Sequence, residues 1–280
     1  MTTRGIVYLY NHKNSYHRKN YHLLDIRNGI YKKWADGPFK LLSTPRGSLD
    51  GKPESLASRN ASEMALLHNI LLRGLNCIYI QAPNVKETFD IADFMKFCDA
   101  WSSILHSHHA AEETIYFRLL DEQSSRNDVF INNHNEHEKF LPGLFAFDLY
   151  VSGVKDDAKP YDGFKLRELI DVFGPDLESH LHHEIGVLVD LEKDESVNWE
   201  ECGKAMAQYS KKNADKTRDV PFLITNSDVT YESGIHGPRF PPFPWFVGLI
   251  FRWIYIPKLK GAWRFSCCDD YGVPKELPFA

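Results

Sequence analysis

The sequence predicts an all-α protein built around an up-down-up-down four-helix bundle. Between about residues 55 and 191, apolar side chains recur at steps of three and four over four long stretches, which is the spacing of one helix face. Short connections separate these stretches, and helices joined in this way pack antiparallel to their neighbours. With 43% hydrophobic residues among 280, the chain can also bury a core of this size.

The bundle accounts for about half of the chain, and we expect three parts. Residues 1–54 form an irregular N-terminal segment, because Asn, Lys, His and Tyr are mixed there without period and Gly-Pro pairs mark turns. Residues 55–195 form the bundle. Residues 196–280 form a C-terminal extension of one helix, a linker and an aromatic tail, which we expect to pack on the bundle.

The four bundle helices are expected at about residues 58–80, 85–122, 128–151 and 166–191. The second has the clearest stripe, which consists of Phe94, Phe97, Trp101, Leu105, His108, Glu112, Ile115 and Leu119. Proline lacks the backbone N–H that a helix interior uses. Pro142 should therefore kink or shorten the third helix, and Gly174-Pro175 should kink the fourth.

Composition argues against several classes of partner. The net charge is −5 and no basic block occurs, so nucleic acid is not an expected partner. Neither a secretory signal nor an uncharged apolar stretch of about 18 residues is evident, so we expect no membrane-spanning helix. The five cysteines lack a Cys-x-x-Cys pair and are expected to be reduced thiols, which favours a cytoplasmic location.

Histidine and glutamate interrupt the apolar stripes at matching depth in all four helices. The six residues are His68, His108, Glu112, His137, His180 and Glu184. His108 and Glu112 are four residues apart, so they project from one face of a helix. His180 and Glu184 repeat this spacing. A lone histidine precedes each pair, by 40 residues in the first half and by 43 in the second.

This pattern indicates a metal centre. A buried charge without a partner is costly, and cations would compensate the two inward glutamates. Each half contributes two imidazoles and one carboxylate, so the bundle can hold two metal ions in its centre. Mixed imidazole and carboxylate ligands suit iron or manganese. Taken singly, each residue has another interpretation, as a hydrogen-bonded core histidine or as part of a surface ion pair.

The rotation of the second helix leaves one alternative open. His109 and Glu113 have the same spacing as His108 and Glu112, and they would replace them if the helix were rotated by one position. The apolar stripe continues into His108, which favours the first pair. The residues expected to lie off the central face are His109, Glu113, His182 and His183. His134, one turn before His137, is a further candidate ligand.

These motifs resemble the hemerythrin-like, or HHE cation-binding, domain. The resemblance lies in His68, His108-His109-Ala110-Ala111-Glu112-Glu113, Glu136-His137-Glu138 and His180-Leu181-His182-His183-Glu184, and it covers about residues 55–195. It implies a four-helix bundle with a non-haem di-iron centre that meets O2 or other small oxidants. Carried over by position, the ligands are His68, His108, Glu112, His137, His180 and Glu184, with His134 as an extra candidate. The implied cofactors are two iron ions, with manganese as an alternative, and O2.

The departures from the family pattern concern the third and fourth helices. Asn133 stands where the oxygen-carrying hemerythrins have histidine, and Ile185 stands where they have aspartate. The set here is nearer to the branch with glutamate on both the second and the fourth helix, which argues against simple O2 transport. The tail that ends Ala262-Trp263-Arg264-Phe265 is similar to that of fungal HHE-domain proteins of this length.

Two classes of function follow. The first is an oxygenase or oxidase that activates O2 and acts on a small apolar organic substrate. The alternative is a non-catalytic protein that binds, senses or stores O2, nitric oxide or iron. The aromatic tail at about 241–265 favours the enzyme, because an organic substrate needs an apolar pocket and the tail could cover one. If the tail is packed in this way, membrane association is not expected.

Overall fold

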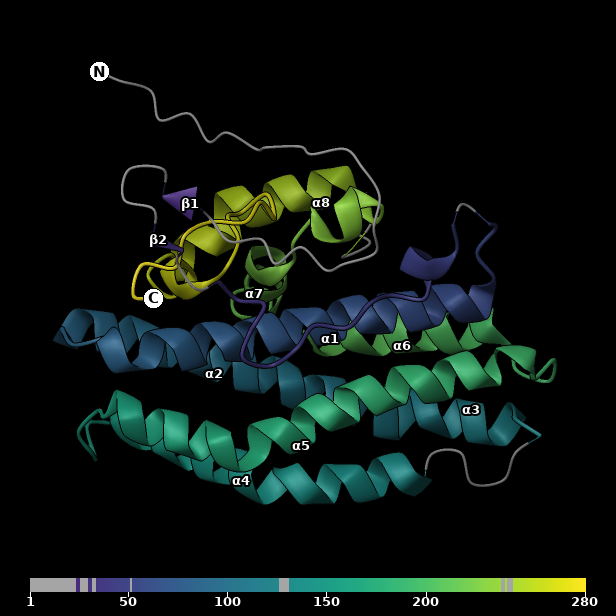
Figure 1. The fold of residues 1–280 in the computed structure, drawn as a ribbon, viewed down its shortest axis with the longest axis horizontal. Helices are drawn as coiled ribbons and strands as arrows, with labels where there is room; N and C mark the ends of the chain where they lie inside the picture. The colour runs from purple at the N-terminus through teal and green to yellow at the C-terminus, as the bar shows by residue number, and fades with distance from the viewer. Residues whose placement is uncertain are drawn as a thin grey trace.

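Four long helices lie side by side in an antiparallel bundle (Figure 1). They are α1 (Leu56–Gln81), α2 (Thr88–Ala111), α4 (Ile131–Lys155) and α5 (Gly163–Asp190). The computed structural model describes residues 24–25, 30–31, 34–50, 52–125, 131–237, 240 and 244–280. Among these residues, strands are confined to the two-residue pair β1 (Leu24–Asp25) and β2 (Ile30–Tyr31). The predicted all-α class is therefore confirmed.

Capping side chains set where the first and last bundle helices begin. Ser55 accepts a hydrogen bond from the backbone N–H of Ser58, and Asp162 caps α5 in the same way. Both helices consequently start slightly earlier than their apolar stripes. Pro142 and Pro175 lie inside α4 and α5, which continue past them, so the third helix is not shortened.

The winding of the second bundle helix changes directly after its two adjacent histidines, His108 and His109. α2 passes into a π-helical turn, η3 (Glu112–Tyr116), and then into α3 (Phe117–Gln123). A π-helical turn holds more residues than an α-helical turn, so the inward face shifts. Tyr116 and Leu120 are buried, whereas the regular stripe predicted Ile115 and Leu119 at these inward positions. Such turns are frequent at functional sites.

The part of the N-terminal segment that the structure describes runs along α1 and is held there by two buried asparagines. Asn69 accepts from the backbone N–H of Leu42 at 2.7 Å and donates to the carbonyl of the same residue at 2.9 Å. Asn76, two turns later, accepts from the N–H of Phe39 and donates to the carbonyls of Ala35 and Phe39. The prediction for residues 1–54 otherwise falls mostly outside the described residues.

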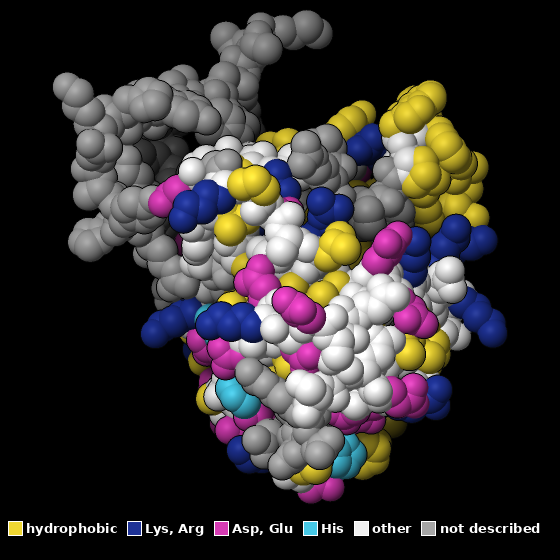
Figure 2. Space-filling view, turned by 90° about the vertical axis from the view of Figure 1, so that its right-hand side faces the viewer, with side chains coloured by type: hydrophobic (Ala, Val, Ile, Leu, Met, Phe, Trp, Pro, Cys, Tyr) yellow, Lys and Arg dark blue, Asp and Glu magenta, His cyan; other side chains and the backbone are white. Residues whose placement is uncertain are grey.

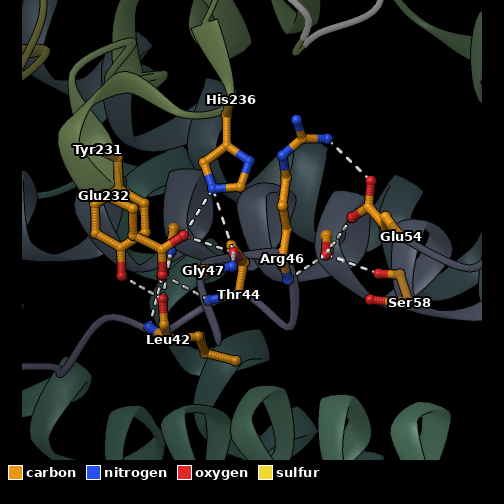
Figure 3. A network of polar contacts seen from close by, with 11 residues as sticks. Leu42, Thr44, Arg46, Gly47, Glu54, Ser58, Tyr231, Glu232 and His236 are labelled. Atoms are coloured by element: carbon orange, nitrogen blue, oxygen red, sulfur yellow. Dashed lines mark hydrogen bonds and ion pairs between the residues drawn. The ribbon is translucent and has the colours of Figure 1, made fainter. Parts of the chain in front are cut away.

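A polar network, here called the Glu232 network, ties this segment to the C-terminal extension (Figure 3). Glu232 accepts from the N–H and the hydroxyl of Thr44 at 2.8 and 2.6 Å, and its Oε2 lies 2.7 Å from Nε2 of His236. The φ of Glu232 is 48°, a left-handed conformation that costs energy for a residue with a side chain. Gly47 leaves room for the carboxylate, because a Cβ at that position would lie 2.7 Å from it.

The C-terminal extension supplies further short helices on one side of the bundle (Figure 1). They are α6 (Trp199–Asn213), α7 (Asp219–Asn226), α8 (Trp245–Ile250), the π-helical η7 (Phe251–Tyr255) and the 3-10 turns η8 (Ile256–Leu259) and η9 (Ala262–Phe265). α6 packs against η3, and η9 packs against α2, where Phe265 lies 4.8 Å from Phe94 between ring centroids.

The aromatic tail is divided between the core and the solvent. Trp263 and Phe265 are buried, but Trp245 and Trp253 are 80% and 81% exposed. The structure therefore differs from the expectation that the whole tail covers a pocket, because α6 rather than α8 packs on the turn that carries Glu112. None of the described helices is long and apolar enough to cross a membrane.

Candidate metal centre

Seven histidine and glutamate side chains meet in the interior of the bundle. They are His68 from α1, His108 and His109 from α2, Glu112 from η3, His137 from α4, and His180 and Glu184 from α5, and all are buried. The six residues that the sequence singled out are all among them. The periodicity of each helix explains why these six converge, since each of them stands where its apolar stripe faces the bundle axis.

The seven side chains form two groups that could each hold a metal ion. The first group is His68, His108, Glu112 and Glu184, and the second is His109, Glu112, His137 and His180. Within each group, one ligand atom per residue lies within 4.8 Å of the others. Glu112 belongs to both groups. The arrangement thus offers two adjoining cation positions that share one carboxylate.

The first group is compact. Nε2 of His68 lies 3.0 Å from Nε2 of His108 and 3.3 Å from Oε2 of Glu184. Nε2 of His108 in turn lies 2.9 Å from Oε1 of Glu112. On the far side of its ring, Nδ1 of His68 donates to the carbonyl of Leu181 at 2.8 Å, so its Nε2 is left with a lone pair that points inward.

The second group shows most directly that a cation fits. Nδ1 of His137 lies 2.7 Å from a carboxylate oxygen of Glu113, and Nδ1 of His180 lies 3.2 Å from one of Glu136. Because carboxylates accept, these two Nδ1 atoms carry the ring protons. The two Nε2 lone pairs then face each other at 3.1 Å. Two facing acceptors repel, and a cation between them removes the repulsion, as in carboxylate-histidine-metal arrangements.

Several buried polar atoms of the centre have no hydrogen-bond partner among the described residues. They are Nδ1 of His108, both ring nitrogens of His109, all four carboxylate oxygens of Glu112 and Glu184, and the hydroxyl of Tyr116. Buried polar atoms are almost always paired, and an unpaired carboxylate is especially costly. Metal ions would satisfy the carboxylate oxygens and one ring nitrogen of His109 together.

The electrostatics of the centre are those of a metal site. Burial, and then the nearby imidazoles, lower the pKa of His108 and His109 well below the usual value, and burial lowers that of His180 to about 4. These rings are therefore neutral near pH 7, which is the form that binds metal. Burial and the charge of Glu184 raise the pKa of Glu112. Burial would also raise the pKa of Glu184, but its contact with His68 lowers it to about 2.

Comparison with known proteins agrees with this geometry. Residues 61–191 match the sequence model of the hemerythrin HHE cation-binding domain. This part of the chain is a hemerythrin domain. The predicted family is thus confirmed, and with it the binding of metal cations as the property of the domain.

A curated relative extends the similarity beyond the hemerythrin domain. The chain is 29% identical over 251 residues to the dimeric xanthone biosynthesis cluster protein R11 of Cryptosporiopsis sp. (strain 8999). The match covers 89% of this chain and 94% of that protein, so it includes most of the C-terminal extension. No solved structure matches the chain.

The position of one buried residue of the hemerythrin domain differs from the prediction. His109 was predicted to lie off the central face, but it is buried, and its ring centroid lies 4.4 Å from that of His137. Adjacent helical residues point about 100° apart. His108 and His109 are nevertheless both buried, because they face different neighbours across the bundle: His108 contacts His68, and His109 contacts His137 and His180. Two consecutive histidines one turn before an inward glutamate are the sequence signal for this arrangement.

The remaining candidates lie around the edge of the centre. The side chains of His134, Glu113 and His183 are 64%, 44% and 49% exposed, and none belongs to either group. His134 instead places Nδ1 3.4 Å from Glu113. His182 is half-buried and contacts the carbonyl of Lys40. Glu113 and Glu136 therefore separate the inner imidazoles from solvent by a single layer of side chains.

Proposed function

We propose that the hemerythrin domain binds two iron ions and that the protein uses them with O2 to oxidise a small organic molecule. The observation that carries this proposal is the pair of four-residue groups that share Glu112. Carboxylate-rich four-helix bundles hold di-iron and di-manganese centres with such shared glutamates. Manganese is the alternative metal, since both ions accept imidazole and carboxylate ligands.

The proposed ligands follow the two groups. One ion would be held by His68, His108, Glu112 and Glu184, and the other by His109, Glu112, His137 and His180. Six of these seven are the residues derived from the sequence, and His109 is added. His134 is left out, because its exposed ring contacts Glu113 and not the centre.

Iron bound by histidine and carboxylate ligands with open positions can bind and activate O2. The protein's own residues would orient the ligands and control protons. Glu113 and Glu136 hold the Nδ1 protons of His137 and His180, which fixes the tautomer and aims Nε2 inward. Because both carboxylates lie at the exposed edge, protons can pass between this edge and the solvent.

Tyr116 adds a proton donor on the inner side. Its hydroxyl is buried, has no hydrogen-bond partner within the part of the chain that the structure describes, and interacts electrostatically with Glu184 and Glu112. Burial, followed by the charge of Glu184, raises its pKa well above the usual value, so the hydroxyl keeps its proton. A protonated phenol beside two carboxylates can donate a hydrogen bond to a group that binds in the centre.

Two observations favour oxidation over storage of O2 or iron. The relative takes its name from a biosynthesis cluster, and the likeness to it spans both the hemerythrin domain and the extension. A biosynthetic role requires chemistry on an organic molecule, and xanthones are oxygenated aromatic compounds. We therefore extend the substrate class from small apolar molecules to polycyclic aromatic ones, which would approach the centre at the edge formed by Glu113 and Glu136.

The test is to load the full chain with iron, reduce it and expose it to O2 with and without hydroxylated xanthones and related polycyclic phenols. We expect iron to approach two per chain, and O2 consumption to rise only with a compound that is converted to an oxidised product. O2 uptake that reverses on degassing, without a product from any compound, would support the non-catalytic alternative. Absence of bound metal would contradict both.

A further inference from the structure

A stripe of large apolar side chains is exposed along α8 and η7, and we call it the α8 face. It consists of Trp245, Phe246, Leu249, Ile250, Trp253 and Ile254. Each of these residues is at least 41% exposed, and the two tryptophans are the most exposed. Figure 2 shows hydrophobic side chains gathered on a projecting part of the surface at the height of α8, with Lys and Arg side chains below them.

The α8 face has the spacing of a single helix surface. Its members recur in adjacent pairs every four residues, which aligns them on one side of a helix. Phe251 and Ile256 point the other way and are buried. The segment is thus packed on the protein through one apolar side and presents a second apolar side to solvent. Contiguous exposed apolar patches of this kind mark interaction sites.

The charges around the α8 face indicate what it contacts. Residues 244–268 contain four basic residues and no acidic residue, although the whole chain has a net charge of −5. Arg264 is ion-paired with Asp90 and Asp93 of α2, so the positive charge beside this face comes from Arg252, Lys258 and Lys260. Lys258 and Lys260 are exposed beside the stripe. Arg252 lies over the ring of the exposed Tyr271, 4.2 Å from its centroid. A basic rim around exposed tryptophan complements anionic lipid headgroups, and tryptophan concentrates where bilayer and water meet.

We propose that the α8 face inserts into the interfacial region of a lipid bilayer that contains anionic lipids, so that the protein is a peripheral membrane protein. A second copy of the chain is a poorer occupant, because a symmetric contact through this face would bring two basic rims together. The proposal replaces the expectation that membranes are not a partner, which assumed a packed tail. It does not depend on the proposed oxidation.

Vesicle binding of the full-length, metal-loaded protein tests this. Sedimentation is compared for vesicles of phosphatidylcholine alone and of phosphatidylcholine with phosphatidylserine. We expect binding mainly to the second. The double variant W245S/W253S should lose about tenfold in partitioning for each tryptophan removed from the bilayer. K258E/K260E should abolish the preference for the anionic vesicles.

A matched control uses two phenylalanines that are equally exposed on the bundle. Phe145 and Phe164 are 63% and 62% exposed on α4 and α5, away from α8 in sequence. The variant F145S/F164S should bind vesicles like the unchanged protein. If it loses as much partitioning as W245S/W253S, binding is a general consequence of surface hydrophobicity and the proposal fails.

Tryptophan fluorescence gives a readout that needs no variant. Of the six tryptophans, the buried ones are Trp34, Trp101, Trp199 and Trp263, which leaves Trp245 and Trp253 to respond to a change of solvent. Anionic vesicles should shift the emission to shorter wavelength, and brominated lipids should quench it. Unchanged emission and no sedimentation with either vesicle would overturn the proposal. So would self-association that W245S/W253S abolishes while vesicle binding is absent.

Discussion

The metal centre and the Glu232 network contain the same residue types at the same spacing, yet they differ in how their polar atoms are paired. His108 and Glu112 are four residues apart, as are Glu232 and His236. In the Glu232 network, Thr44 donates twice to the carboxylate and His236 lies against it. In the centre, Nε2 of His108 also lies against the carboxylate of Glu112, at 2.9 Å, but no hydroxyl or backbone N–H of the described residues donates to it.

This difference separates a ligand pair from a structural pair. A carboxylate whose lone pairs are occupied by protein donors is already stabilised and has little capacity left for a cation. A buried carboxylate without such donors needs one. The spacing of histidine and glutamate is therefore weaker evidence for a metal site than the lack of donors around the carboxylate. The following experiments test that distinction.

The largest effect should come from Glu112, because it belongs to both groups. The variant E112A should lose most of both metal ions, whereas E232A should keep both. Metal analysis of the purified variants measures this directly. Retention of two ions by E112A would show that the shared carboxylate is not a ligand.

Removal of metal should lower stability substantially. Metal present at about a thousandfold over its Kd stabilises the folded state by about 4 kcal/mol, and a chain of this size then gains on the order of 10 °C in Tm. Chelation followed by thermal unfolding measures this shift, and E112A is the control that should not respond. An unchanged Tm after complete chelation would mean that the buried polar groups of the centre do not need cations to be stabilised.

A smaller effect should follow from removing a single nitrogen ligand. The variant H109A should lose about one metal ion per chain, because His109 belongs to the second group alone. H183A is the matched control, since the side chain of His183 is 49% exposed and contacts Glu136 at the edge. Equal metal content in the two variants would show that His109 is not a ligand, as the sequence predicted.

The smallest effect concerns the Glu232 network and depends on pH. Burial would raise the pKa of Glu232, but hydrogen bonds from His236 and Thr44 lower it below 4.5. A depressed carboxyl pKa contributes stability above the unfolded value, and this stability is lost as the pH falls through the folded value. E232Q should therefore cost about 1–2 kcal/mol at neutral pH. Unfolding of the metal-free proteins measured from pH 7 to 3 should show the difference shrinking below pH 4.5, and E232Q should bind as much metal as the unchanged protein at pH 7.

Much of the centre could be predicted from the sequence because helical periodicity relates spacing to direction. Six inward residues followed from four apolar stripes. His109 did not, because a single stripe assigns one inward position per turn, whereas a site for two ions needs a wider face. The burial of Tyr116 in place of Ile115 was not predicted either, because a π-helical turn changes the helical period locally and has no residue signature in this chain.

Which side chains of the aromatic tail are buried could not be predicted, for a different reason. Composition indicates that a segment is apolar, but not whether its partner is the protein, a substrate or another surface. Phe251 and Trp253 are two residues apart, and one is 8% exposed while the other is 81% exposed. Only the packing of η7 against α7 and η8 decides which side of the segment remains free.

The asparagine contacts on α1 have a mechanical consequence. Asn69 and Asn76 each donate and accept, so α1 cannot roll or slide along the N-terminal segment without breaking hydrogen bonds at two points. Asn69 directly follows His68, so the same restraint fixes the position from which that ring reaches the centre. Metal-ligand distances change when an ion gains or loses an electron. In the proposed iron centre, a helix braced from outside would resist that displacement and would favour electron transfer with little movement of the protein.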